Sequence, residues 1–214
     1  NVNFSYVDRE TGQESFVSLP EAGEGGLIIG ESLPAGSVHT IGSDAGERKL
    51  ALFRIDAQVN PGSGRVIPLG ALSTPMKEAI KTADAYLKAN VRNLGIDRDL
   101  KAYDFTIQAV NLSQAKEGSE TAVAFFISMV SALLERPVKP RTVVMGEMSV
   151  QGLLLKVANL PERMELALDA GGTTIMIPSE NKRDLADVPD ELLNKVQPVF
   201  YTDPLNAAKR ALGE

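Results

Sequence analysis

The sequence predicts an α+β fold, a mixed-sheet α/β domain with a small N-terminal β-appendage. Two observations lead to this prediction. Stretches in which apolar and polar residues alternate, which are typical of strands, occur among stretches in which apolar residues recur every three or four positions, which are typical of helices. The two kinds of stretch also do not follow the strict strand–helix–strand order of a parallel sheet. With 214 residues, the chain is long enough for one compact domain, or for one domain with an appendage.

The N-terminal segment predicts a β-hairpin followed by a joint. Asn3–Val7 and Ser15–Leu19 alternate and are separated by turn-forming residues, which is typical of a hairpin. Glu21–Gly30 contains four glycines and has no strand or helix period. We therefore expect residues 1–30 to form the appendage with its joint, and residues 31–214 to form the main domain.

The remaining elements follow from periodicity and turn signals. Strands are predicted where β-branched residues and alternation coincide, at Ser37–Ile41, Lys49–Val59, Arg65–Leu69, Tyr103–Val110, Thr142–Met148, Thr174–Ile177 and Val199–Tyr201. Helices are predicted where the period changes, at Thr74–Val91, Ser119–Leu134, Pro161–Ala170, Lys182–Leu185 and Asp203–Leu212. Ser73 or Thr74 is expected to cap the first of these helices, and Gly95 to end it.

The composition excludes several kinds of site. The chain has no cysteine, which excludes disulfides, thiolate nucleophiles and cysteine-bound zinc, and which makes a cytoplasmic location the expectation. The single histidine, His39, has no acidic neighbour at a useful offset, so we interpret it as a structural or surface residue. The net charge of −6 argues against attraction of the domain as a whole to nucleic acid or to an anionic membrane. No apolar run is long enough to span a membrane.

One segment could carry chemistry on local evidence. In Gln114–Ala122 a polar, glycine-containing loop runs directly into an apolar helix, so that free backbone N–H groups converge where a nucleophile and an oxyanion hole could lie. The alternative is a plain helix cap by Ser119 or Gly118, with Glu120 in the first turn. The local residues favour the cap. Gly42–Lys49 lacks the Gly-Lys-Ser/Thr ending of a phosphate loop.

The chain from about residue 50 to residue 212 resembles the proteolytic domain of the Lon family of ATP-dependent proteases. The most specific part of the match runs from Ile177 through Pro-Ser-Glu-Asn-Lys-Arg-Asp-Leu to Val188-Pro189. Further stretches occur in the family order, at Gly70–Ala83, Asn93–Ile96, Lys116–Ala122, Arg136–Val138 and Met145–Gly152. The resemblance implies the Lon proteolytic-domain fold, which is of the ribosomal protein S5 domain 2-like type.

The resemblance also implies a Ser–Lys dyad, and here the chain departs from the family. The position of the family serine falls on Glu120, and that of the family lysine falls on Arg163. The threonine that precedes the family Gly-Glu falls on Met145. A carboxylate is a poor nucleophile for amide cleavage, and an arginine stays protonated and cannot act as a general base. We therefore expect Glu120 and Arg163 to form an ion pair at a degenerate dyad.

Three functions remain open at this stage, of which the third is a stand-alone binding module without a motor. The first is a non-catalytic Lon-like assembly domain of an ATP-driven ring. The second is an active Lon-type serine endopeptidase that acts on protein substrates, in which Ser119 is the nucleophile and Lys156 or Lys116 is the base. The second requires a shift of one residue, which on a helix turns a side chain by about 100°.

Among Lon relatives, the degenerate dyad and the β-rich lead-in resemble the C-terminal domain of the Lon-related protein of BREX phage-defence systems. This resemblance implies an upstream AAA+ module that binds ATP and Mg²⁺, assembly of copies into a ring such as a hexamer, and DNA as a partner reached through the upstream regions. Because the chain begins with Asn1, we expect it to be a processed product or an excised fragment. No cofactor, metal or membrane partner is expected for the fragment itself.

Overall fold

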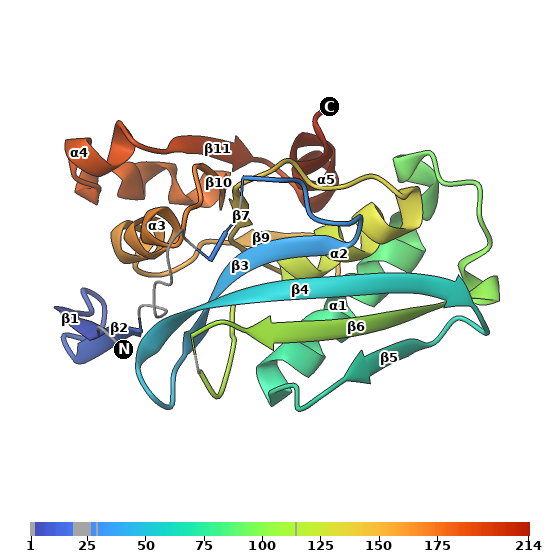
Figure 1. Ribbon diagram of the computed structural model, residues 1–214, viewed down its shortest axis with the longest axis horizontal. Coiled ribbons are helices and arrows are strands. Elements are labelled where there is room, and N and C mark those ends of the chain that lie inside the picture. The colour runs from blue at the N-terminus through green and yellow to red at the C-terminus, as the bar shows by residue number, and fades with distance from the viewer. Residues whose placement is uncertain (1–2, 19–26, 29, 114) are drawn as a thin grey trace.

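The computed structural model of the protein describes residues 3–18, 27–28, 30–113 and 115–214. In this part of the chain, a nine-stranded mixed sheet has helices on both faces (Figure 1). The path through the sheet is β1-β2-β4-β3-β7-β10-β11, and β6 lies between β4 and β5. Its strands are β1 (Asn3–Val7), β2 (Glu14–Ser18), β3 (Ser37–Asp44), β4 (Lys49–Pro61), β5 (Val66–Leu69), β6 (Tyr103–Asn111), β7 (Thr142–Val144), β10 (Thr174–Pro178) and β11 (Gln197–Tyr201).

A separate two-stranded antiparallel sheet joins β8 (Glu147–Met148) to β9 (Leu154–Leu155). The α-helices are α1 (Thr74–Asn90), α2 (Ala122–Leu134), α3 (Leu160–Asp169), α4 (Asp190–Leu193) and α5 (Pro204–Leu212). Three 3₁₀ helices complete the described elements, at η1 (Val91–Leu94), η2 (Leu100–Ala102) and η3 (Ser179–Asp187). The mixed α/β architecture predicted from the sequence is confirmed.

Strand β4 is the centre of the sheet because both of its faces are apolar over its first half. Ala51, Phe53 and Ile55 belong to the core beneath α1 and α2, whereas Leu50 and Leu52 belong to a second core on the opposite face. Such two-sided burial is typical of a central strand. From Arg54 onward the second face is polar, and Arg54, Asp56 and Gln58 are partly or fully exposed to solvent.

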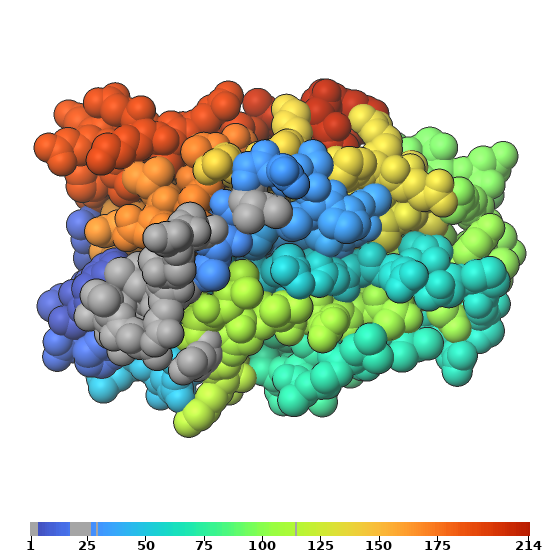
Figure 2. Space-filling model, viewed as in Figure 1, coloured from blue at the N-terminus to red at the C-terminus, as the bar shows by residue number. Residues whose placement is uncertain are grey.

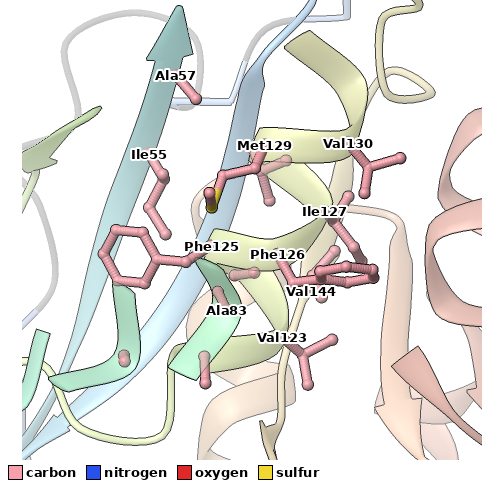
Figure 3. Close-up of a cluster of buried hydrophobic side chains, with 14 of the residues drawn as sticks. Ile55, Ala57, Ala83, Val123, Phe125, Phe126, Ile127, Met129, Val130 and Val144 are labelled. Atoms are coloured by element: carbon pink, nitrogen blue, oxygen red, sulfur yellow. The ribbon is translucent and has the colours of Figure 1, made fainter. Parts of the chain in front are cut away.

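Helix α2 lies in the middle of the first core and is almost entirely buried. Figure 3 shows Phe125 pointing toward Ile55 of β4, while Phe126 lies on another side of the helix. The ring of Phe126 meets that of Tyr86 on α1 edge to face, with 5.1 Å between the ring centroids. A helix that is apolar all round must be covered on all sides, and here β3, β4, α1 and α5 cover it.

The second core holds α3 against the other face of the sheet. Leu160, Met164 and Ala167 of α3 pack with Ile41 of β3 and Val17 of β2 in one buried cluster. The amphipathic pattern that predicts α3 therefore has a simple basis, since one stripe of the helix faces the sheet. This cluster is what brings α3 close to the loop that precedes α2.

The N-terminal hairpin is confirmed, and it extends the main sheet. Strands β1 and β2 pair antiparallel, and β2 pairs parallel to the start of β4 through Phe16–Lys49 and Val17–Leu50. Of the joint expected at residues 21–30, residues 21–26 and 29 lie outside the described residues. The division of the chain at residue 30 stays a prediction.

The strand expected at Thr142–Met148 is interrupted. It ends at Val144, and a new strand begins at Glu147 after Gly146, whose φ of 146° is a glycine conformation. The buried Tyr201 donates its hydroxyl to the Met145 carbonyl, and a β-carbon at Gly146 would overlap that hydroxyl. The sequence does carry a turn signal here, because Gly146-Glu147 interrupts the apolar run, and the prediction of one continuous strand missed it.

Candidate functional site

The loop before α2 is paired with β3 and does not cap the helix. The Ser43 N–H donates to the Ser119 carbonyl at 3.1 Å, and the Ser119 N–H donates to the Ser43 carbonyl at 2.8 Å. Thr121 takes the N-cap position, and α2 begins at Ala122. The expected start of the helix at Ser119, with Ser119 or Gly118 as its cap and Glu120 in its first turn, is therefore wrong.

Glu120 lies between this bridge and the helix, with a φ of 63° that is uncommon for a residue other than glycine. Its carboxylate is contacted from three segments. Oε1 accepts a hydrogen bond from Ser43 Oγ at 2.8 Å and lies 3.0 Å from Arg163 Nη2, and Oε2 accepts from the Ala158 N–H at 3.2 Å. The Glu120 side chain is 24% exposed, so the carboxylate lies at the edge of the protein interior.

Arg163, on the first turn of α3, is completely buried and contacts three segments. Nε donates to the Ala158 carbonyl at 2.7 Å, and Nη1 donates to the Ile41 carbonyl of β3 at 2.8 Å. The third nitrogen, Nη2, forms the ion pair with Glu120 without hydrogen-bond alignment. The contact between Glu120 and Arg163 that the sequence predicts is therefore present, and it joins the loop before α2 to α3.

Asp44 holds the preceding part of the same loop. The residue is buried, and Oδ2 of its carboxylate accepts the backbone N–H groups of Lys116 at 2.9 Å and Glu117 at 3.1 Å. Its other oxygen accepts the N–H of Glu47 at 3.0 Å. The turn after β3 and the loop before α2 are thus fixed to each other by one side chain.

A second carboxylate, that of Glu147, lies close to Glu120. Burial raises the pKa of Glu147, and the negative charge of Glu120 raises it further. Hydrogen bonding to the backbone N–H groups of Met148, Glu120 and Ala122 acts in the opposite direction on the same pKa. The amide groups at the start of α2, which could form an oxyanion hole, therefore face a carboxylate of the same chain.

Each of the two lysines proposed as the base of the alternative dyad interacts with a glutamate. Lys156 Nζ lies 3.4 Å from Glu10 Oε1, and its side chain is 57% exposed. Lys116 Nζ lies 2.9 Å from Glu47 Oε1, and this carboxylate raises the pKa of Lys116. A lysine that acts as a general base must lose its proton, which burial favours and a neighbouring carboxylate opposes.

His39 is buried in β3, opposite Arg54 of β4. Burial lowers the pKa of His39 to about 4, and the charge of Arg54 contributes to this. Among the described residues, no three or more His, Cys, Asp or Glu side chains are grouped so that they could hold a metal ion. No helix in the described ranges is long and apolar enough to cross a membrane.

Sequence reasoning did not identify the partners that complete the site. Ser43, Ala158 and Ile41 contribute a hydroxyl, a peptide group and a carbonyl, none of which has a sequence signature. The role of Asp44 has no sequence signature either, because Asp44 binds a loop 72 residues away. Of these additional residues, only Glu147 has a recognisable sequence pattern, because Gly146-Glu147 lies between two apolar runs.

The comparisons with known proteins agree with this fold. Residues 42–213 match the family model of the Lon protease (S16) C-terminal proteolytic domain. The chain is 34% identical to the Lon-like protease BrxL of Escherichia coli O9:H4 (strain HS), over all of this chain and 31% of the relative. It is 31% identical to the Lon-like protease BrxL of Bacillus cereus (strain H3081.97), over all of this chain and 32% of the relative.

A Lon protease of Xanthomonas oryzae pv. oryzae is 31% identical over 71% of this chain and 18% of its own length. The chain thus spans about a third of the length of the BrxL relatives that it matches. The family model covers most of the chain, from within β3 to the end of α5. The chain therefore belongs to the family of Lon protease C-terminal proteolytic domains.

Proposed function

We propose that this domain is a Lon-type proteolytic domain with a degenerate Ser–Lys dyad, which acts as an assembly domain of an ATP-driven AAA+ ring. The observation that carries the proposal is the ion pair between Glu120 and Arg163, 3.0 Å apart. By the resemblance given above, these two residues stand at the positions of the family serine and lysine. Their opposite charges complement each other in place of a nucleophile and a base.

The chemistry of the pair supports a structural role. A Ser–Lys dyad needs an amine that can be neutral, whereas a guanidinium does not lose its proton in a protein. The Glu120 carboxylate already interacts with Arg163, Ser43 and the Ala158 N–H, which leaves it poorly suited to attack a peptide bond. Since each contact comes from a different segment, the pair supports the packing of α3 against β3.

The alternative is an active endopeptidase that uses Ser119 with Lys156 or Lys116. The name of the relatives, Lon-like protease, favours this alternative. The positions of the lysines speak against it, because both amines are exposed and paired with carboxylates. The backbone pairing of Ser119 with Ser43 further ties the candidate nucleophile to β3.

The remaining parts of the proposal concern the whole protein. ATP and Mg²⁺ would be bound by an upstream AAA+ module, and copies of this domain would pack side by side in a ring such as a hexamer. DNA would be reached through upstream regions, since this chain has a net charge of −6. Phage defence and a cytoplasmic location are proposed with it, on the similarity to BrxL.

A peptidase assay on the full-length protein with ATP and Mg²⁺ tests the loss of catalysis. We expect wild type and Ser119→Ala to give the same background cleavage of a fluorogenic peptide and of an unfolded protein. A Lon protease with an intact dyad serves as the positive control. Cleavage by the wild type that Ser119→Ala or Glu120→Ala abolishes would contradict the proposal.

The assembly role needs its own measurement. The mass of the full-length protein in solution is compared with that of a version that lacks residues 1–214, with and without ATP. We expect the ring to form only when the domain is present. Equal assembly without the domain would show that the ring is held together elsewhere.

A further inference from the structure

The N-terminal hairpin β1–β2 lies outside the part of the chain that Lon proteases share. The family model begins at residue 42, and the Xanthomonas Lon protease aligns with 71% of the chain. Both BrxL relatives align with all of it, hairpin included. The hairpin is therefore a feature of this chain and its BrxL relatives that the Lon match does not explain.

The hairpin is built into the second core. Val17 is completely buried in the cluster that contains Leu160 and Met164 of α3, and Phe4 and Tyr6 pack against that cluster. Burial, together with the nearby charge of Glu162 on α3, raises the pKa of Tyr6 to about 12. Figures 1 and 2 show the hairpin directly beside α3 at one end of the molecule.

The turn of the hairpin makes three polar contacts with the segments next to the site. Asn159 Nδ2 donates to Asp8 Oδ2 at 3.2 Å. Lys156 Nζ lies 3.4 Å from Glu10 Oε1. A third contact joins Arg9 Nη1 to Asp187 Oδ2 of η3 at 3.0 Å. The turn and these segments line a partly open pocket of about 110 Å³, whose lining includes neither Glu120 nor Arg163.

The segment 156–159, which receives two of these contacts, also contacts both members of the ion pair. The Ala158 N–H binds Glu120, and the Ala158 carbonyl binds Arg163. The neighbouring Val157 exchanges both of its backbone bonds with the side chain of Asn181, at 2.9 Å and 2.8 Å. The hairpin thus contacts residues 156 and 159, on either side of the peptide groups that contact the site.

We infer that the β1–β2 hairpin is a built-in cover of the 156–159 segment, which holds that segment against the Glu120–Arg163 pair. The inference rests on the proposed function, because it concerns the same site. The packing partner of this segment is thus the hairpin of the same chain.

Hydrogen exchange in the full-length protein tests the cover. The variant Arg9→Ala/Glu10→Ala removes two contacts from the hairpin side, and Lys156→Ala/Asp187→Ala removes the same two from the other side. We expect both variants to raise the exchange of the Val157 and Ala158 amides about three- to tenfold, as fits the loss of two exposed ion pairs. The control is Glu78→Ala/Lys81→Ala, which removes an exposed ion pair on α1.

Accessibility to a protease gives the second readout. Trypsin must bind a stretch of chain around Lys156 to cleave after it, so we expect faster cleavage there in Arg9→Ala/Glu10→Ala than in wild type. The exchange of the Phe16 amide, which donates to Arg48, shows whether the hairpin itself stays folded. Unchanged exchange at Val157 and Ala158 in both variants would overturn the inference.

These measurements are independent of catalysis. If wild type cleaves peptides while the variants change exchange as expected, the proposed function fails and the cover stands. If wild type is inactive and exchange does not change, the cover fails and the proposed function stands.

Discussion

Arg163 donates a hydrogen bond from α3 to the carbonyl of Ile41 in β3, across 122 residues of sequence. The Ile41 carbonyl lies in the sheet interior, where an unpaired acceptor is costly. The guanidinium also contacts Ala158 and Glu120, so that one buried side chain connects a strand and two loops to the helix. Three parts of the chain that are distant in sequence, namely β3, the loop before α2 and residues 158–163, are therefore joined by the side chain of Arg163.

Replacement of the two members of the ion pair should have unequal effects. Arg163→Met leaves two carbonyls without their donor and the Glu120 carboxylate without its counter-charge, and we expect it to lower the free energy of unfolding by about 3–5 kcal/mol. Glu120→Gln keeps the shape and leaves Arg163 with its two carbonyl acceptors, so a loss of about 1–2 kcal/mol is expected. Urea unfolding followed by circular dichroism measures both, and equal losses would contradict this account.

His39 makes stability depend on pH. Its pKa is lowered from 6.5 to about 4 in the folded chain, so the unfolded chain binds more protons between these values. The contribution of His39 is thus fully present above pH 6.5 and is lost as the pH falls toward 4, by up to about 3 kcal/mol. We expect His39→Gln to flatten the stability profile between pH 7 and pH 4.5. A wild-type slope that persists in this variant would assign the dependence to other groups.

The turn at Gly146 and Tyr201 gives a pair of variants that should couple. Gly146→Ala places a carbon against the Tyr201 hydroxyl and requires a backbone conformation that favours glycine, so we expect a loss above about 3 kcal/mol. Tyr201→Phe leaves the Met145 carbonyl without its donor and should cost about 1–2 kcal/mol. In the double variant the overlap is relieved, and the loss should be smaller than the sum of the two. Additive losses would show that the contact is not the cause.

The fold was largely predictable because its elements depend on local periodicity. The strands at β3, β4 and β6 and the helices α1 and α3 have a clear alternation or amphipathic stripe, and the structure places them within a few residues of the expected bounds. The start of α2 was mispredicted because Ser119 pairs with Ser43, a contact across 76 residues that local signals do not encode. Serine is a favourable capping residue, but the long-range pairing of Ser119 with Ser43 prevents Ser119 from capping the helix.

The site was predictable only where side chains carry the chemistry. The charges of Glu120 and Arg163 are visible in the sequence, and their complementarity predicts the contact that the structure shows. The hydroxyl of Ser43 and the peptide group of Ala158 are not visible in this way, because any residue has a peptide group and serines are common. The docking of the hairpin turn on Lys156 and Asn159 likewise depends on tertiary packing.

The double variant Glu120→Ser/Arg163→Lys tests whether the scaffold still supports the family chemistry. Residue 163 is completely buried, so a lysine there would lose solvation, which lowers its pKa and favours the neutral amine that a base requires. We expect peptide hydrolysis at least about tenfold above that of Glu120→Ala/Arg163→Lys, because removal of a catalytic serine costs far more than this factor. Equal rates in the serine and alanine variants would show that residues 120 and 163 no longer have the geometry of a dyad. The site would then differ from that of the family in more than these two side chains.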